Sequence, residues 1–241
     1  MADDTNADKI QDLNGNWITE EELLKGKTED QIKALKFIRS IGTSAGCFKT
    51  EFVTYEAFSE VLKNKIAKES INKEAALSHL GVDEDQVKEI NPICFQYYVI
   101  NDEKNLPRYI KYVKESDVYV SSIYQVTWLF FGSDQVYVHS KSFDVTSDAT
   151  QSQTEEYFYK DIVSFSTENQ SKQESILEET VEAGCGNKEV KRNYVSKMVK
   201  TASFKIGIPG EPFRCVYKEG DGIVTTNVNA MKQKLREKKQ A

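Results

Sequence analysis

The sequence predicts an α+β protein in which a small helical N-terminal region precedes an antiparallel β region that ends in a helix. Three observations support this class. Residues 28–91 place apolar side chains at helical spacing, residues 119–217 carry short runs rich in Val, Ile, Tyr and Phe between turn residues, and the last residues return to the helical period. We expect a flexible acidic leader over 1–27, a helical region over 28–115 and a β domain with a C-terminal helix over 116–241.

Four helices are expected in the first part of the chain. Thr19 and Thr28 each open a capping box, in which the residue three places later reaches back to the cap amide, and the first helix is expected after Thr28. The second helix is expected near Thr54. A short third helix is expected to stop at Gly81, which accepts left-handed backbone angles. A fourth is predicted over 83–90, before Pro92. The stripe that predicts the second of the four helices consists of Tyr55, Phe58, Leu62 and Ile66.

The middle of the chain changes to a strand pattern. The runs 119–131 and 136–139 flank Gly132-Ser133-Asp134, which predicts a hairpin. Residues 157–165 predict a third strand region. Two weaker strands are expected between 168 and 200.

The last part of the chain carries a further turn signal and a helical stripe. Residues 203–208 and 213–217 flank the turn 209–212, which predicts another hairpin. A helix is expected from Ile223, and its apolar stripe is expected to pack on the sheet. The stripe consists of Val224, Val228, Met231 and Leu235.

The order of segments in the β region carries a resemblance to a known class of domain. The segments are Leu129–Gly132, Val136–Val138, Tyr159–Phe165, Phe204–Ile206, Phe213–Val216 and the helix containing Met231. Together they resemble the bacterial PH-like and GRAM-like domains over residues 118–239, whereas the N-terminal half resembles no family. The resemblance implies an antiparallel sheet or barrel capped by the C-terminal helix. It also implies non-enzymatic binding to membranes, peptides or proteins.

One feature departs from the phosphoinositide-binding members of that class. Those members use basic residues around the first hairpin, whereas the turn 132–135 of this chain contains neither Lys nor Arg. The resemblance therefore does not extend to inositol-phosphate recognition at that turn.

The sequence shows no motif for a catalytic, cofactor or metal site, so we predict none and expect a protein that is not an enzyme. His79 and His139 are the two histidines, and neither lies in an HExxH or HxH setting. Residues 42–46 are rich in glycine but lack the Lys-Ser/Thr ending of a phosphate-binding loop.

The four cysteines are too scattered for a CxxC pair, which favours small buried side chains over a zinc site. Cys185 is the exception, because it lies between two glycines in an expected exposed turn. The cysteines are Cys47, Cys94, Cys185 and Cys215.

Composition and charge narrow the partner classes. The chain has 241 residues and a formal net charge of -6, which argues against general nucleic-acid affinity because phosphate binding requires clustered cations. No apolar stretch reaches the roughly 20 residues that span a bilayer, and residues 1–16 lack a signal-peptide pattern. We therefore expect a soluble, cytoplasmic protein.

The basic C-terminal tail is the candidate contact surface. Such a run of cations after an apolar stripe can bind an anionic membrane or an acidic partner, or can simply solubilise a helix end. The residues are Lys232, Lys234, Arg236, Lys238 and Lys239.

The function predicted from these observations is a non-enzymatic binding or scaffolding protein that acts through the PH-like region. We expect a protein partner first and an anionic membrane surface second. One alternative is a nucleic-acid-associated regulator that uses a helix-turn-helix around Gly81, although its second helix is acidic. The other is an enzyme of a class without a known motif. The oligomeric state stays open.

Overall fold

The computed structural model describes residues 9–44, 50–88, 90–100, 108–183, 188–218 and 222–240, and it confirms the α+β class. Its helices are α1 (Glu20–Leu24), α2 (Glu29–Ile38), α3 (Tyr55–Lys68), α4 (Lys73–Leu80) and α5 (Gly222–Gln240), with 3-10 turns at Glu84–Val87 and Lys114–Ser116. Its strands are β1 (Lys9–Gln11), β2 (Trp17–Thr19), β3 (Thr43–Ser44), β4 (Thr50–Glu51), β5 (Ile90–Tyr98), β6 (Ile110–Val113), β7 (Val118–Ser121), β8 (Ile123–Phe131), β9 (Gln135–Asp144), β10 (Thr150–Phe158), β11 (Ser164–Ala183), β12 (Lys188–Gly207) and β13 (Phe213–Tyr217).

The N-terminal helices start where the capping residues predict. Thr19 and Glu22 form a complete capping box at α1, and Thr28 forms one with Gln31 at α2. The Thr54 hydroxyl accepts the Ala57 amide at the start of α3. Gly81 ends α4 with φ 66°, a left-handed conformation that favours glycine.

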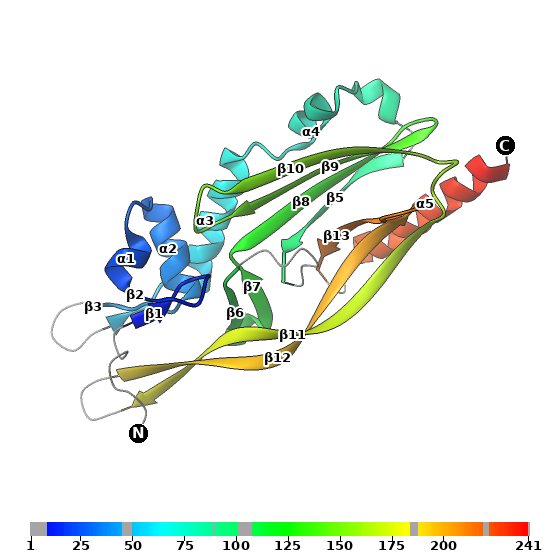
Figure 1. Ribbon diagram of the computed structural model, residues 1–241. Coiled ribbons are helices and arrows are strands. Elements are labelled where there is room, and N and C mark those ends of the chain that lie inside the picture. The colour runs from blue at the N-terminus through cyan, green and yellow to red at the C-terminus, as the bar shows by residue number, and fades with distance from the viewer. Residues whose placement is uncertain are drawn as a thin grey trace.

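Two larger sheets form most of the β structure (Figure 1), and two short antiparallel pairs, β1–β2 and β3–β4, accompany the N-terminal helices. The first has the strand order β10-β9-β8-β5 and is antiparallel throughout. The second has the order β13-β12-β11-β6-β7, in which the long β11–β12 hairpin is antiparallel and β6 joins β11 in parallel. Among the described strands no pairing joins the two sheets, so the closed-barrel form of the expected domain is not adopted.

One apolar core lies between the sheets and under the C-terminal helix. Phe204 of β12 is fully buried and stacks between Phe95 and Phe165, with ring centroids 5.0 and 6.0 Å apart. The expected packing of the α5 stripe is confirmed for Val228, Met231 and Leu235, which are all buried in this core; the side chain of Val224 lies outside the described part.

A second core joins the helices to both sheets. Phe37 of α2 stacks on Phe58 of α3 with ring centroids 4.6 Å apart, and both belong to a cluster that also contains Val126 of β8 and Val199 of β12. The helical region and the β region therefore share one hydrophobic core.

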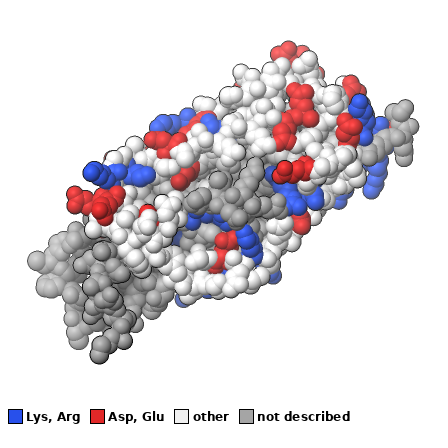
Figure 2. Space-filling view, in the orientation of Figure 1, with Lys and Arg blue, Asp and Glu red and all other residues white. Residues whose placement is uncertain are grey.

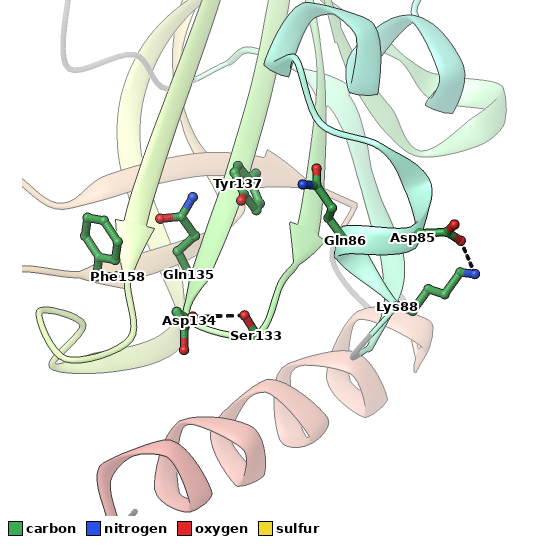
Figure 3. A pocket seen from close by; sticks show the side chains of 8 residues that line it. All are labelled: Asp85, Gln86, Lys88, Ser133, Asp134, Gln135, Tyr137 and Phe158. Atoms are coloured by element: carbon green, nitrogen blue, oxygen red, sulfur yellow. Dashed lines mark hydrogen bonds and ion pairs between the residues drawn. The ribbon is translucent and has the colours of Figure 1, made fainter.

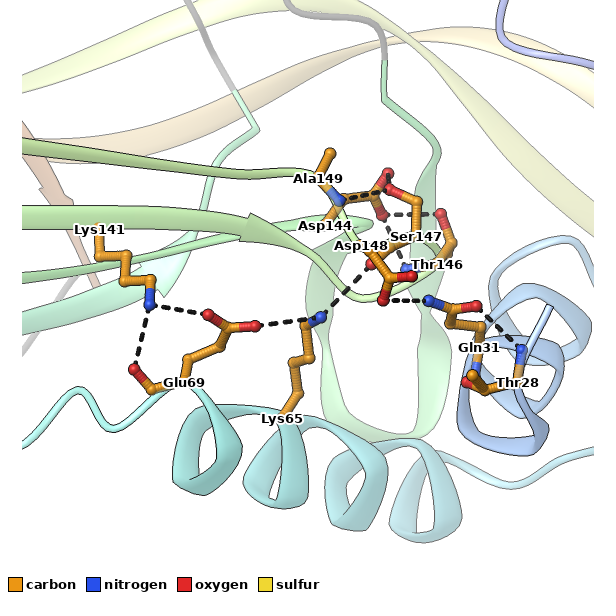
Figure 4. A network of polar contacts seen from close by, with 10 residues as sticks. All are labelled: Thr28, Gln31, Lys65, Glu69, Lys141, Asp144, Thr146, Ser147, Asp148 and Ala149. Carbon is orange, nitrogen blue, oxygen red and sulfur yellow. Dashed lines mark hydrogen bonds and ion pairs between the residues drawn. The ribbon is translucent and has the colours of Figure 1, made fainter.

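A polar network fastens α3 to the loop between β9 and β10 (Figure 4). The Glu69 carboxylate lies 2.7 Å from Lys141 Nζ and 3.2 Å from Lys65 Nζ. Lys65 also donates to the Ser147 carbonyl, and Gln31 of α2 donates to Asp148 in the same loop at 2.9 Å. These side chains are each satisfied by partners within the protein, so the network is structural.

The region expected to be helical also contains strands. The predicted helix over 83–90 is one 3-10 turn, Glu84–Val87, and β5 follows it, so the helix-turn-helix outline is wrong. Ile93 and Phe95 alternate into the inter-sheet core, and this alternation outweighs the short helical pattern. Pro92 lies where the register of β5 shifts, a position at which a strand tolerates proline. β6 likewise lies inside the range 28–115.

Two further sequence expectations are corrected. The leader over 1–27 contains the β1–β2 hairpin and α1 from Lys9 onward. The third strand region over 157–165 is the end of β10, a turn and the start of β11. Tyr159 and Ile162 are buried in that turn, because they fill the corner between the two sheets instead of extending a strand.

Some expectations fall outside the described residues. These concern Cys47 and Cys185, the turn around Cys185, and the second half of the glycine-rich segment 42–46. In the part of the chain that is described, no helix is both long and apolar enough to cross a membrane.

Candidate functional site between the sheets

The candidate site is a polar groove of about 330 Å³ between the two sheets. One wall is the inner face of β8, β9 and β10, and the other is built by β11, β12 and the edge of β13. Interior faces of packed sheets are normally apolar, so this concentration of amides and hydroxyls is unusual. The polar lining residues are Gln125, Ser140, Ser142, Gln151, Gln153, Glu155, Gln170, Thr201 and Ser203.

Strand geometry explains why these side chains meet. Successive residues of a strand point to opposite faces, so Gln151, Gln153 and Glu155 of β10 share one face. Antiparallel pairing places Ser142 opposite Gln151 and Ser140 opposite Gln153, on the same face of the sheet. The alternation T-Q-S-Q-T-E in the sequence of β10 thus becomes one continuous polar wall.

Two hydrogen bonds organise the floor of the groove. The hydroxyls of Thr127 and Ser140 lie 2.8 Å apart and are both buried. Gln125 accepts the backbone amide of Val216 through Oε1 at 3.2 Å. This second bond joins the first sheet to β13, the edge strand of the second sheet, and it satisfies an amide that the β12–β13 ladder leaves on the outer side.

The ionisable groups at the groove are mainly acidic. Glu155 and Glu211 line it together with Arg214. The guanidinium of Arg214 lies 3.9 Å from the Glu168 carboxylate, so its charge is partly balanced outside the groove. A ligand in the groove therefore meets more negative than positive charge.

Both described thiols, Cys215 at the groove and Cys94 on β5, lie where their charged form is disfavoured. Cys215 is buried at the groove, and burial raises the pKa of its thiol well above the usual range. Burial raises the pKa of Cys94 to about 11. Both are protonated at neutral pH, and a protonated thiol is a poor nucleophile.

His139 lies on the opposite face of β9 from the groove. Its ring stacks on His79 of α4, with centroids 5.0 Å apart and an interplanar angle of 4°. Burial lowers the pKa of His139 to about 4, and repulsion by His79 and Lys141 adds to this effect. The two imidazoles form a packing contact between α4 and the sheet.

A second hollow, of about 760 Å³, surrounds the β8–β9 turn (Figure 3). Asp134 of that turn and Asp85 contribute carboxylates, and Lys88, its one cation among the lining residues, is paired with Asp85. Phe158 forms part of the rim. This hollow offers an anion little positive charge, consistent with the absence of Lys and Arg from the turn. It also lacks the enclosing second sheet that the groove has.

The basic tail lies on α5 at the opposite end of the molecule from α1–α3 (Figure 1). Lys232, Lys234 and Lys238 are half-buried and Arg236 is exposed, whereas the side chain of Lys239 is outside the described part. On the face shown in Figure 2, positive and negative side chains are interspersed. The structure does not bring these tail residues into the groove.

Neither the comparisons with known proteins nor the placement of possible metal ligands assigns a function to this chain. No family model, no curated protein and no solved structure matches this chain. Among the described residues, no group of three or more His, Cys, Asp or Glu side chains is placed to hold a metal ion.

Sequence reasoning missed the groove, although a signal was present. β10 reads as a polar segment, and its alternation of Gln and Glu with Ser and Thr is a strand pattern without apolar residues. The pairing of Ser140 and Ser142 with that strand follows only from the register of the hairpin.

Proposed function

We propose that this chain is a non-enzymatic binding or scaffolding protein that acts through its PH-like region on a protein partner. The observation that carries the proposal is the polar groove between the sheets, where a folded domain would otherwise bury apolar side chains. Amides and hydroxyls in a concave site fix a ligand by hydrogen bonds without transforming it. From β8 onward, the chain order of three antiparallel strands, the β11–β13 meander and α5 is compatible with the PH-like resemblance, whereas β6 and β7 precede these strands and join the second sheet.

The state of the ionisable groups supports binding over catalysis. The described thiols are held protonated by burial, and His139 is turned away from the groove. A general base or a nucleophile needs a pKa close to the working pH, and these groups are displaced from it.

Site-specific photo-crosslinking tests the proposal. A photoreactive residue replaces Gln153 in the groove wall or, as the matched control, the exposed Lys63 of α3. We expect a protein of the source cell to crosslink at position 153 and not at position 63. The same crosslinked proteins at both positions, or none at position 153, would contradict a groove that binds protein.

A membrane surface is the second candidate, favoured by the end of the molecule that carries α5. Phe158 and Val163 are 47% and 64% exposed on the β10–β11 turn, and Lys160 lies between them in sequence. That turn and α5 lie at the same end of the molecule (Figure 1). Exposed apolar residues with neighbouring cations suit an anionic bilayer, where each cation is worth about 1 kcal/mol.

Co-sedimentation with anionic vesicles at low and moderate salt tests this candidate. The variant replaces Lys232, Lys234, Arg236 and Lys238 with Gln and keeps Leu235, because Leu235 is buried in the core. Salt-sensitive binding that this variant loses would favour the membrane. Equal sedimentation with neutral vesicles would contradict it.

A further inference from the structure

Among the described residues, no strand pairs with the outer edge of β10 along the groove. β10 lies at the end of the β10-β9-β8-β5 sheet and, among the described strands, pairs with β9 alone. Its nine residues pair with β9 in continuous register, and most of them are exposed. An open edge of this length is a template for another strand.

The hydrogen bonds at the two ends of β10 show which backbone groups face the open edge. Asp144 donates to the Ala149 carbonyl before the strand, and Tyr159 donates to the Asp134 carbonyl after it. Because hydrogen-bonded pairs alternate in an antiparallel ladder, the odd-numbered residues 151–157 bond to β9. Ser152, Thr154 and Glu156 therefore direct their amide and carbonyl groups to the outside.

Three of the usual protections of an edge strand, which are proline, lysine and a bulge, are missing from β10. Proteins guard such edges with proline, with lysine or with a bulge that twists the edge away. The segment T-Q-S-Q-T-E-E-Y-F contains neither proline nor lysine nor arginine, and its register with β9 shows no shift. Its charged residues are Glu155 and Glu156, and these carboxylates would repel an added strand that carries acidic side chains.

The groove defines which strand would fit. A strand added to β10 continues the alternation of the sheet, so every second side chain lies beside Gln151, Gln153 and Glu155. Glu211 faces the same space, and Arg214 is drawn toward Glu168. Lys or Arg at alternate positions of the added strand would be complementary to this wall.

We propose that an extended segment of a partner protein adds as a fifth strand to the free edge of β10 and directs basic side chains into the inter-sheet groove. The backbone of Ser152, Thr154 and Glu156 would supply the main-chain hydrogen bonds, and the groove would select the side chains. This inference rests on the proposed binding function and names the partner class and the contact.

Peptide selection on the full chain tests the inference. A displayed library of random ten-residue peptides is selected on the immobilised protein, and enriched peptides are measured by fluorescence anisotropy. Thr154→Pro removes an outward amide without a ladder bond to β9, and Thr154→Ala keeps that amide. We expect Lys or Arg at alternate positions of the peptides, unchanged affinity for Thr154→Ala and roughly tenfold or more weaker binding to Thr154→Pro.

Hydrogen exchange of the wild-type protein gives a readout that needs no variant. Bound peptide should slow exchange of the Ser152, Thr154 and Glu156 amides and leave the amides of 151, 153 and 155 unchanged. Exchange that stays the same at all six positions, or equal binding to Thr154→Pro, overturns the added strand.

The remaining outcomes separate this inference from the proposed function. Failure to enrich any peptide overturns the inference, whereas a protein that crosslinks at position 153 would still support the proposed binding function. A dimer that Thr154→Pro abolishes in sedimentation velocity also overturns it, because a second copy of this chain would then occupy the edge.

Discussion

The space between the two sheets is apolar on one side, near α5, and polar on the other, toward the turn between β9 and β10. The change occurs within single strands: along β9 the inward residues Val136 and Val138 belong to the apolar core, whereas Ser140 and Ser142 line the groove. On β12, Phe204 is buried in the core, whereas its neighbour Ser203 lies on the opposite face of the strand and lines the groove. Both sides have the same backbone scaffold, so the difference lies in the side chains.

The contrast teaches which part of the interior the fold requires. The apolar side buries aromatic rings against α5, and such burial stabilises a domain by about 25 cal/mol per Å² of apolar surface. The polar side lacks this stabilisation by apolar burial, because a hydroxyl or amide that is hydrated in the groove contributes little to the free energy of unfolding. A surface that does not hold the fold together is available for a ligand.

The largest expected effect comes from replacing one residue on each side of β12. Phe204→Ala removes a fully buried ring that stacks on Phe95 and Phe165, and we expect a loss of about 3–5 kcal/mol in the free energy of unfolding. Ser203→Ala is the matched control and should change it by less than about 0.5 kcal/mol. Urea denaturation measures both, and comparable losses in the two variants would break the comparison.

The sequence predicted most of the scaffold but not this division. Capping at Thr28 and Thr54, the turn at Gly132–Asp134 and the α5 stripe are local patterns within one turn or one face, and the structure confirms the elements they predict. β5 was missed because a helical pattern and a strand alternation compete over 83–98. The groove was missed because it depends on which strands pair, and pairing is non-local.

His139 is a buried polar residue outside the groove, and its effect on the free energy of unfolding can be compared with that of the groove residues. Its Nδ1 is buried and has no hydrogen-bond partner among the described residues. Because burial lowers its pKa to about 4, from 6.5, the unfolded chain binds more protons between these pH values. Stability should therefore fall as the pH drops from about 6.5 to about 4, by on the order of 1–2 kcal/mol.

Chemical denaturation across this pH range measures the effect. His139→Phe removes the titrating group and should flatten the profile over that window, whereas His79→Gln should keep most of the fall because His79 is exposed. A wild-type profile that the His139→Phe protein reproduces would show that other groups cause the fall. An NMR titration of the His139 ring gives its pKa directly.

The smallest expected effect concerns the groove residue with a structural contact. Gln125 accepts the Val216 amide at 3.2 Å and so links the polar wall to β13. Gln125→Ala leaves that amide without its acceptor and should cost about 1 kcal/mol, whereas Gln125→Glu keeps an acceptor oxygen in place and should cost less. Thermal unfolding of the two proteins distinguishes them. An unchanged Gln125→Ala protein would mean that water replaces the side chain at this position, and Gln125 would then belong with Ser140 and Gln153 to the surface that faces a ligand.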